Sequence, residues 1–397
     1  MRAGLAGLYI HITERNGELY RADEDFPRYE YSELNQFLRP LMPRVCGLEI
    51  TSRCGLAQYI RELVSSWIQY GTMKSAKYLV IEHKHAVNST VIGPPTEASH
   101  PNYSLGEIEK FQSFFESLRT LRLHEIFISP ANTIYHGLTE LHLYDCLSDY
   151  NITQSCLFRL LSASLAIRSL RLIGANILAE PNFSFAPLSL KHLETLSIRV
   201  NQGQVGNPVY ALALIKRGSD SFSMGFEFRR MHLEEPLVSI VQQFLAHSNV
   251  KLLHVRGWNI GFPFRMLLTP IPQLHTLALS YCDLRDSAIE NFDRSSTNGS
   301  SSLSDPWPQL QVLLVHECVG IKSHLQRLLA IHPVQKFRAW WKFGDHPGRF
   351  EDLGDRARFE QVLRATIPDV KCGYSAFEDP IDWDAFPPPF DCDHDPE

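Results

Sequence analysis

The sequence lacks the short motifs that are typical of enzymes and metal-binding proteins. Its eight cysteines are far apart and form no C-x-x-C pair. This argues against a zinc site and against a disulfide framework, and it favours a reducing, intracellular compartment. The sequence has no G-x-S-x-G, H-E-x-x-H, G-x-x-x-x-G-K-[ST] or G-x-G-x-x-G motif. We therefore predict no catalytic residue, no metal ligand and no cofactor.

Long apolar runs and excess positive charge are also missing. No apolar run approaches the roughly 18 residues that a membrane span requires, and the first residues do not read as a signal peptide. The net charge of −6 argues against nucleic-acid binding by the chain as a whole. The composition, 44% hydrophobic and 21% charged, is that of a globular protein. We expect a cytoplasmic or nuclear protein that binds no membrane, with nucleic acid disfavoured as a partner.

The sequence does contain a recurring apolar pattern, L-x-x-L-x-L, in which I, V, F, M or A can replace Leu. If the strand-like stretch FSMGFEF at 222–228 is counted as an incomplete copy, the third positions recur every 20 to 42 residues. The widest gaps contain residues 86–106 and 293–306, which are rich in Ser, Pro and Gly and read as surface insertions. The ten copies have their apolar residues at Val45-Leu48-Ile50, Ala76-Leu79-Ile81, Leu118-Leu121-Leu123, Leu138-Leu141-Leu143, Ile167-Leu170-Leu172, Leu193-Leu196-Ile198, Val250-Leu253-Val255, Leu274-Leu277-Leu279, Leu310-Leu313-Val315 and Val334-Phe337-Ala339.

The alternating part of this pattern predicts a short strand. Its period of two sends both aliphatic residues to one side and the residue between them to the other. One unit cannot bury its apolar side alone, whereas stacked units form a continuous core. Leucine-rich repeats have about 20 to 29 residues per unit. The pattern therefore predicts an α/β fold, a leucine-rich-repeat solenoid with a curved parallel sheet on the concave side and helices or irregular segments on the convex side.

Three cysteines occupy one position of the repeat. Cys146, Cys282 and Cys318 each follow the third apolar residue by three positions, where a small, buried side chain with weak hydrogen-bonding capacity fits the turn out of the strand. Leu279, Cys282 and the following DLRDSAI resemble the cysteine-containing class of leucine-rich repeat, whose consensus continues C-x-x-[IL]-T-D. We interpret these cysteines as structural.

Together with the long spacers, these repeats resemble the repeat portion of F-box proteins, especially the divergent fungal sets. The stretches LYIHI at 8–12, FLRPLMPRVCGLEI at 37–50 and PWPQLQVLLVHEC at 306–318 carry the resemblance. It implies a substrate receptor that docks to a ubiquitin-ligase adaptor through its F-box. No helical segment with an L-P-x-E-[IVL] start precedes Leu8. The adaptor is therefore expected as a partner only if an F-box lies upstream.

We predict four regions along the chain. Residues 1–44 would form an N-terminal capping strand and helix, and residues 45–345 an array of about 10 to 11 irregular repeats. Residues 346–374 would form a C-terminal cap. Residues 375–397 carry eight carboxylate side chains and no Lys or Arg, which predicts a disordered acidic tail. This tail would be either a solvated extension or a segment that lies against a basic surface and competes with a ligand.

The residues that point away from the aliphatic side are the candidate binding surface. From Arg122 to Arg338, the position between the two aliphatic residues and the position after them contain Arg and His but no Asp or Glu. Arg and aromatic residues are favoured interface anchors. The alternative is that these are ordinary strand positions, neutralised by neighbours such as Glu140. The predicted partner-binding residues are Arg122, His142, Tyr144, Arg171, Arg199, His254, Arg256, Arg338 and Trp340.

These features favour a non-enzymatic protein-interaction module that presents a basic concave sheet to a protein partner. The basic charge of that sheet favours an acidic partner. One alternative is a leucine-rich-repeat scaffold without a role in ubiquitin ligation. Another is a parallel solenoid enzyme acting on polysaccharide, which would need clustered carboxylates on the exposed sheet. The outward positions hold few carboxylates, so the sequence disfavours the enzyme.

Overall fold

The computed structural model describes part of the chain. The insertion at 293–306, Cys146 and the acidic tail at 375–397 lie outside this part, as does most of the insertion at 86–106. The described residues are 7–13, 28–52, 57–72, 75–83, 90–92, 105–128, 136–145, 152–181, 185–200, 206–217, 220, 222–229, 235–258, 271–282, 309–318, 329, 332, 334–340 and 353–373.

The chain divides into two compact units, and the first comprises Met1–Leu193 and Gln204–Ile215. Its six main strands pair in parallel in the order β1-β2-β3-β5-β7-β9. They are β1 (Leu8–Thr13), β2 (Val45–Ser52), β3 (Tyr78–His83), β5 (Thr120–His124), β7 (Glu140–Tyr144) and β9 (Ser169–Ile173). The helices are α1 (Arg28–Leu38), η1 (Arg39–Arg44), α2 (Ala57–Tyr70), α3 (Leu105–Ser117), α4 (Gln154–Ala163) and η2 (Pro208–Leu214). Short strands are β4 (Thr90–Ile92), β6 (Ile126–Ile128), β8 (Ile152–Thr153), β10 (Ile177–Leu178) and β11 (Leu188–Ser189).

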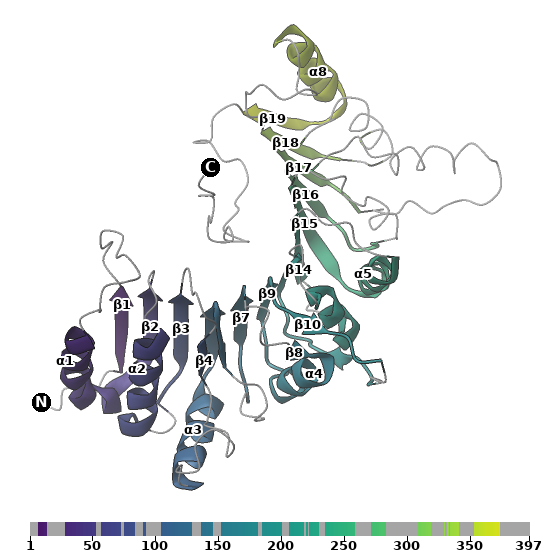
Figure 1. Cartoon of the computed structure of the whole chain (residues 1–397). Coiled ribbons are helices and arrows are strands. Elements are labelled where there is room, and N and C mark those ends of the chain that lie inside the picture. The colour runs from purple at the N-terminus through teal and green to yellow at the C-terminus, as the bar shows by residue number, and fades with distance from the viewer. Residues whose placement is uncertain are drawn as a thin grey trace, which may run out of the picture. The chain divides into compact units, whose positions relative to one another are not determined.

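The second unit comprises Glu194–Gly203 and Lys216–Glu397. Its seven main strands are also parallel, in the order β12-β14-β15-β16-β17-β18-β19. They are β12 (Thr195–Val200), β14 (Phe222–Arg229), β15 (Val250–Trp258), β16 (Thr276–Ser280), β17 (Val312–His316), β18 (Lys336–Trp340) and β19 (Asp369–Gly373). Its described helices include α5 (Glu235–His247) and α8 (Leu353–Thr366), which are labelled in Figure 1. The short strand β13 (Ile215–Arg217) spans the sequence boundary between the units.

The aliphatic triplets form the core, as the repeat pattern predicts. Every residue of the ten triplets is at most 6% exposed. Equivalent positions also pair across strands, so that Leu121, Leu141 and Leu170 follow one another from β5 to β9. In the first unit α2 packs on this side, where Trp67 donates its Nε1–H to the Val45 carbonyl at 3.3 Å. A row of equivalent aliphatic residues therefore runs through each unit.

A left-handed residue ends several strands at the same position of the repeat. Glu125, Asp145, Tyr281 and Glu317 have φ between 43° and 56° and directly follow β5, β7, β16 and β17. Each of their N–H groups donates to the carbonyl of the last residue of the next strand, at 2.7 to 3.0 Å. At this position Gly174, with a φ of 62°, follows β9. The same left-handed backbone conformation therefore recurs where these strands end. Only Gly adopts this conformation without steric cost.

The cysteine position follows this turn. Cys282 and Cys318 are buried, and each thiol donates to the carbonyl of the third apolar residue of the preceding strand, Val255 or Leu279, at 3.6 and 3.5 Å. Burial, with the Cys318 thiol next, raises the pKa of the Cys282 thiol well above its usual value. These two cysteines are structural groups, since each thiol links its own turn to the strand before it.

The α/β class and the parallel strands are therefore confirmed. The stretch at 222–228 forms β14 although it lacks the full pattern, and two strands without a triplet, β1 and β19, pair with the first and last triplet strands. Because neighbouring strands pair in register, equivalent positions of successive repeats lie side by side across the sheet. This pairing determines which polar side chains come into contact.

Candidate functional site

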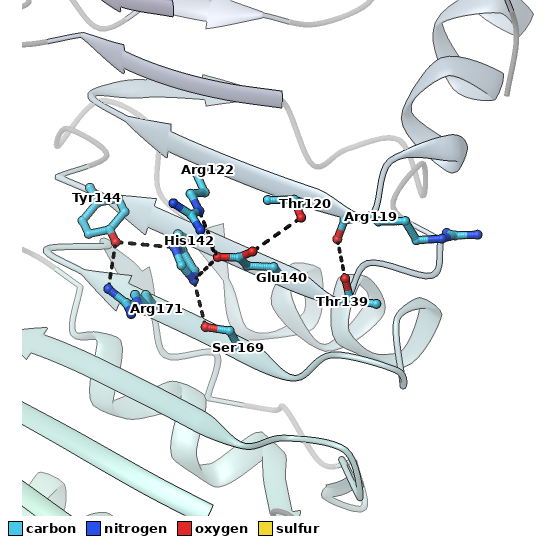
Figure 2. Close-up of polar contacts among 9 residues, drawn as sticks. All are labelled: Arg119, Thr120, Arg122, Thr139, Glu140, His142, Tyr144, Ser169 and Arg171. Atoms are coloured by element: carbon cyan, nitrogen blue, oxygen red, sulfur yellow. Dashed lines mark hydrogen bonds and ion pairs between the residues drawn. The ribbon is translucent and has the colours of Figure 1, made fainter. Parts of the chain in front are cut away.

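The first unit carries a polar cluster on β5, β7 and β9, on the side opposite the aliphatic triplets. We call it the β5–β9 cluster. Strand register brings its members together, since Arg122 pairs with His142 and His142 with Arg171 along one row, while Glu140 pairs with Ser169 in the row before. Alternation along each strand points all of these side chains to one face, as Figure 2 shows. The cluster consists of Arg122, Glu140, His142, Tyr144, Ser169 and Arg171.

Arg122 and Glu140 form an ion pair across β5 and β7. Glu140 Oε1 accepts from Arg122 Nη2 at 2.6 Å and from Nε at 2.9 Å, while Thr120 donates its hydroxyl to Oε2 at 3.4 Å. Partial burial alone would lower the pKa of Arg122, but Glu140 raises it above its usual value. The charge of Arg122 is therefore balanced within the cluster.

His142 lies at the centre of the cluster and is 2% exposed. Its Nε2 is 3.1 Å from Glu140 Oε1 and 2.9 Å from the Ser169 hydroxyl, and its Nδ1 is 3.5 Å from the Tyr144 hydroxyl. Burial, then the charges of Arg171 and Arg122, lower the pKa of His142 to about 2. The negative charge of Glu140 would raise the pKa of His142, but the same carboxylate oxygen is paired with Arg122. We infer a neutral ring that donates from Nε2 and accepts at Nδ1.

Arg171 differs from Arg122 in having no acidic partner. The half-buried side chain donates from Nη1 to the Tyr144 hydroxyl at 3.5 Å, and its buried Nε has no hydrogen-bond partner. Within the described part of the chain, no carboxylate forms an ion pair with it. Arg171 therefore gives the β5–β9 cluster an uncompensated positive charge.

The other five predicted residues lie in the second unit, and two of its arginines are paired and buried. Arg199 donates from Nε to Glu227 Oε2 at 2.8 Å, with side chains 3% and 8% exposed. Arg338 donates from Nη1 and Nη2 to the two carboxylate oxygens of Asp369 at 2.9 and 2.5 Å, and links β18 to β19. These pairs neutralise much of the basic strip that the sequence predicts.

Aromatic rings adjoin the remaining candidates of the second unit. The Arg256 guanidinium lies 5.1 Å from the centre of the Tyr281 ring, and Tyr281, His316 and Trp340 follow one another in edge-to-face contacts at 5.1 and 5.8 Å. His254 lies 3.0 Å from the Ser280 hydroxyl. Burial, then the charges of Arg256 and His316, lower its pKa to about 3. Trp340 is 3% exposed and thus part of the packed structure.

The structure therefore brings four of the nine predicted residues together, Arg122, His142, Tyr144 and Arg171, and places Arg199, His254, Arg256, Arg338 and Trp340 in the second unit. The sequence interpretation left out two acids that decide the electrostatics, Glu227 and Asp369. Glu227 lies in the alternating stretch FSMGFEF, which could have revealed it if that stretch had been aligned with the triplets. Asp369 belongs to a strand that carries no triplet.

Comparison with protein-family models and with curated proteins gave no match for this chain. Among the described helices, none is both long enough and apolar enough to cross a membrane. The described residues also include no group of three or more His, Cys, Asp or Glu side chains arranged to hold a metal ion. The interpretation of the site therefore depends on its own geometry.

Proposed function

We propose that this chain is a non-enzymatic protein-interaction protein of the leucine-rich-repeat type, and that it binds a protein partner through the face that carries the β5–β9 cluster. The repeated triplets, their strand-to-strand register and the hydrogen-bonded Cys282 and Cys318 support the repeat class. The curved solenoid that the sequence predicts, with this face as its concave side, is part of the proposal.

One observation carries the choice of surface. Arg171 is half-buried and has no carboxylate partner in the described part of the chain, whereas Arg122, Arg199 and Arg338 all have one. A guanidinium without an acidic partner is costly unless another group completes its hydrogen bonds. A partner that supplies such a group would complete the hydrogen bonds of Arg171 and so gain binding free energy. We therefore place binding at Arg171.

The resemblance to F-box proteins extends the proposal to a substrate receptor of a ubiquitin ligase, provided that an F-box lies upstream. Affinity capture with the chain tests the binding face, and capture with a longer chain that includes any upstream segment tests the link to a ligase. We expect ligase adaptor subunits in the capture if the extension holds, and a further set of proteins bound through the face.

The test of the face compares two charge reversals in the same unit. Arg171→Glu should lose the captured partners, because it replaces the unbalanced positive charge with a carboxylate where the partner binds. Arg159→Glu is the control, since Arg159 is exposed on α4. Equal capture by both variants, with both folded by circular dichroism, would refute the placement of the binding face.

A further inference from the structure

We propose that Arg171 and Tyr144 form a subsite for one carboxylate, supplied by an Asp or Glu side chain of the protein partner. This inference rests on the proposed function and specifies the chemistry of its partner. It depends on the juxtaposition of a guanidinium and a phenol on neighbouring strands, with Nη1 and the hydroxyl 3.5 Å apart.

The net charge of the β5–β9 cluster favours a ligand with one negative charge. Arg122 and Glu140 cancel each other at 2.6 Å, and His142 carries no charge at neutral pH. Among the six residues of the cluster, Arg171 is the one whose charge is not balanced by another member. A single negative charge on the partner is its electrostatic complement.

The Tyr144 hydroxyl can support the same ligand. It accepts from Arg171 and lies 3.5 Å from His142 Nδ1, a long contact that loses little when the hydroxyl proton turns elsewhere. A carboxylate held by Arg171 is a stronger acceptor than this distant imidazole nitrogen. The ligand would therefore receive charge-assisted bonds from the guanidinium and one bond from the phenol.

The same geometry favours a carboxylate over a phosphate. Phosphate groups carry nearly two negative charges and are usually bound by several arginines. Here the second arginine, Arg122, already holds Glu140, whose carboxylate would repel a dianion. A phosphopeptide is consequently the competing outcome of the test.

The test uses pools of nine-residue peptides that are randomised except at the centre, which is Glu, Gln or phosphoserine. The full chain is immobilised, and the retained amount of each pool is measured. We expect the Glu pool to exceed the Gln pool by about tenfold, the size of one charge-assisted hydrogen bond. Stronger retention of the phosphoserine pool than of the Glu pool would overturn the carboxylate assignment.

Four variants test which residues cause the preference for the Glu pool over the Gln pool. Arg171→Gln should equalise the Glu and Gln pools, whereas Arg171→Lys should restore part of the difference because it keeps the charge. Tyr144→Phe should weaken the preference for Glu by about threefold, as expected for one lost neutral hydrogen bond. Arg159→Gln on α4 removes the same charge elsewhere and should leave the preference unchanged. A preference that survives Arg171→Gln would show that the subsite lies at another residue.

A further charge reversal separates failure of the subsite from failure of the proposed function. If the Glu and Gln pools are retained equally by the wild-type chain but both are lost with Arg171→Glu, the face binds peptides and the carboxylate subsite is wrong. If Arg171→Glu retains every pool as the wild-type chain does, the binding face itself is wrong.

Discussion

The neutral His142 gives the stability of the first unit a pH dependence that can be calculated. Unfolding exposes the ring and returns its pKa from about 2 to about 6.5. As the pH falls through 6.5, the unfolded chain gains a proton that the folded chain does not bind, so the free energy of unfolding decreases. This loss continues until the pH approaches 2.

The expected magnitude follows from linkage. The free energy changes by about 1.4 kcal/mol per pH unit where the unfolded ring is protonated and the folded ring is not. Because the unfolded ring is only partly protonated near pH 6.5, the loss between pH 7 and pH 5 is about 2 kcal/mol.

The assay compares wild-type chain with His142→Gln in urea unfolding at pH 7 and pH 5, using hydrogen exchange of peptides from β7 to follow the first unit. His142→Gln should lose about 2 kcal/mol less than wild type over this range. His247→Gln is the control, because His247 is exposed in the last turn of α5.

Equal losses in wild type and His142→Gln would refute the reasoning, since they would mean that His142 binds a proton in the folded state. Imidazole NMR signals give an independent check. A His142 ring that titrates between pH 5 and pH 7 would show that Glu140, 3.1 Å away, dominates over burial and the two arginines.

Two further predictions concern the strand ends. Glu317→Gly should raise the free energy of unfolding by up to about 1 kcal/mol, because Gly adopts its φ of 47° without steric cost, whereas Glu317→Val should lower it; thermal unfolding that shifts the same way for both would contradict the left-handed turn. Cys282 should resist iodoacetamide in the folded chain and react after unfolding, because burial and the neighbouring Cys318 raise the pKa of its thiol. Mass spectrometry of the labelled peptides measures this, and rapid labelling of folded Cys282 would show that the thiol is accessible.

Local pattern was enough to predict the apolar half of each strand. Each L-x-L alternation specifies a strand with one apolar side, and stacking equivalent strands is the arrangement that buries all of those sides at once. Leu121, Leu141 and Leu170 accordingly meet in register, and Cys282 and Cys318 occupy equivalent turns. The register of the aliphatic residues also placed Arg122 beside His142.

The charge state of the polar face could not be predicted in the same way. Whether an arginine is balanced depends on which acid stands on the next strand, and that strand begins 18 or more residues away in the sequence. Arg199 is neutralised by Glu227 of β14, which lacks the full pattern, and Arg338 by Asp369 of β19, which has none. The strip looked basic in the sequence because β14 and β19, which carry Glu227 and Asp369, lack the full repeat pattern.

By itself, the sequence determined that aliphatic triplets would lie on parallel strands with polar residues opposite them, because that outcome depends on alternation within a few residues. Only the tertiary structure decided which arginines are balanced, because an ion pair depends on the distance between side chains of different strands. It left Arg171 without an acidic partner in the described part of the chain, while Arg122, two strands away in the sheet, is bound to Glu140.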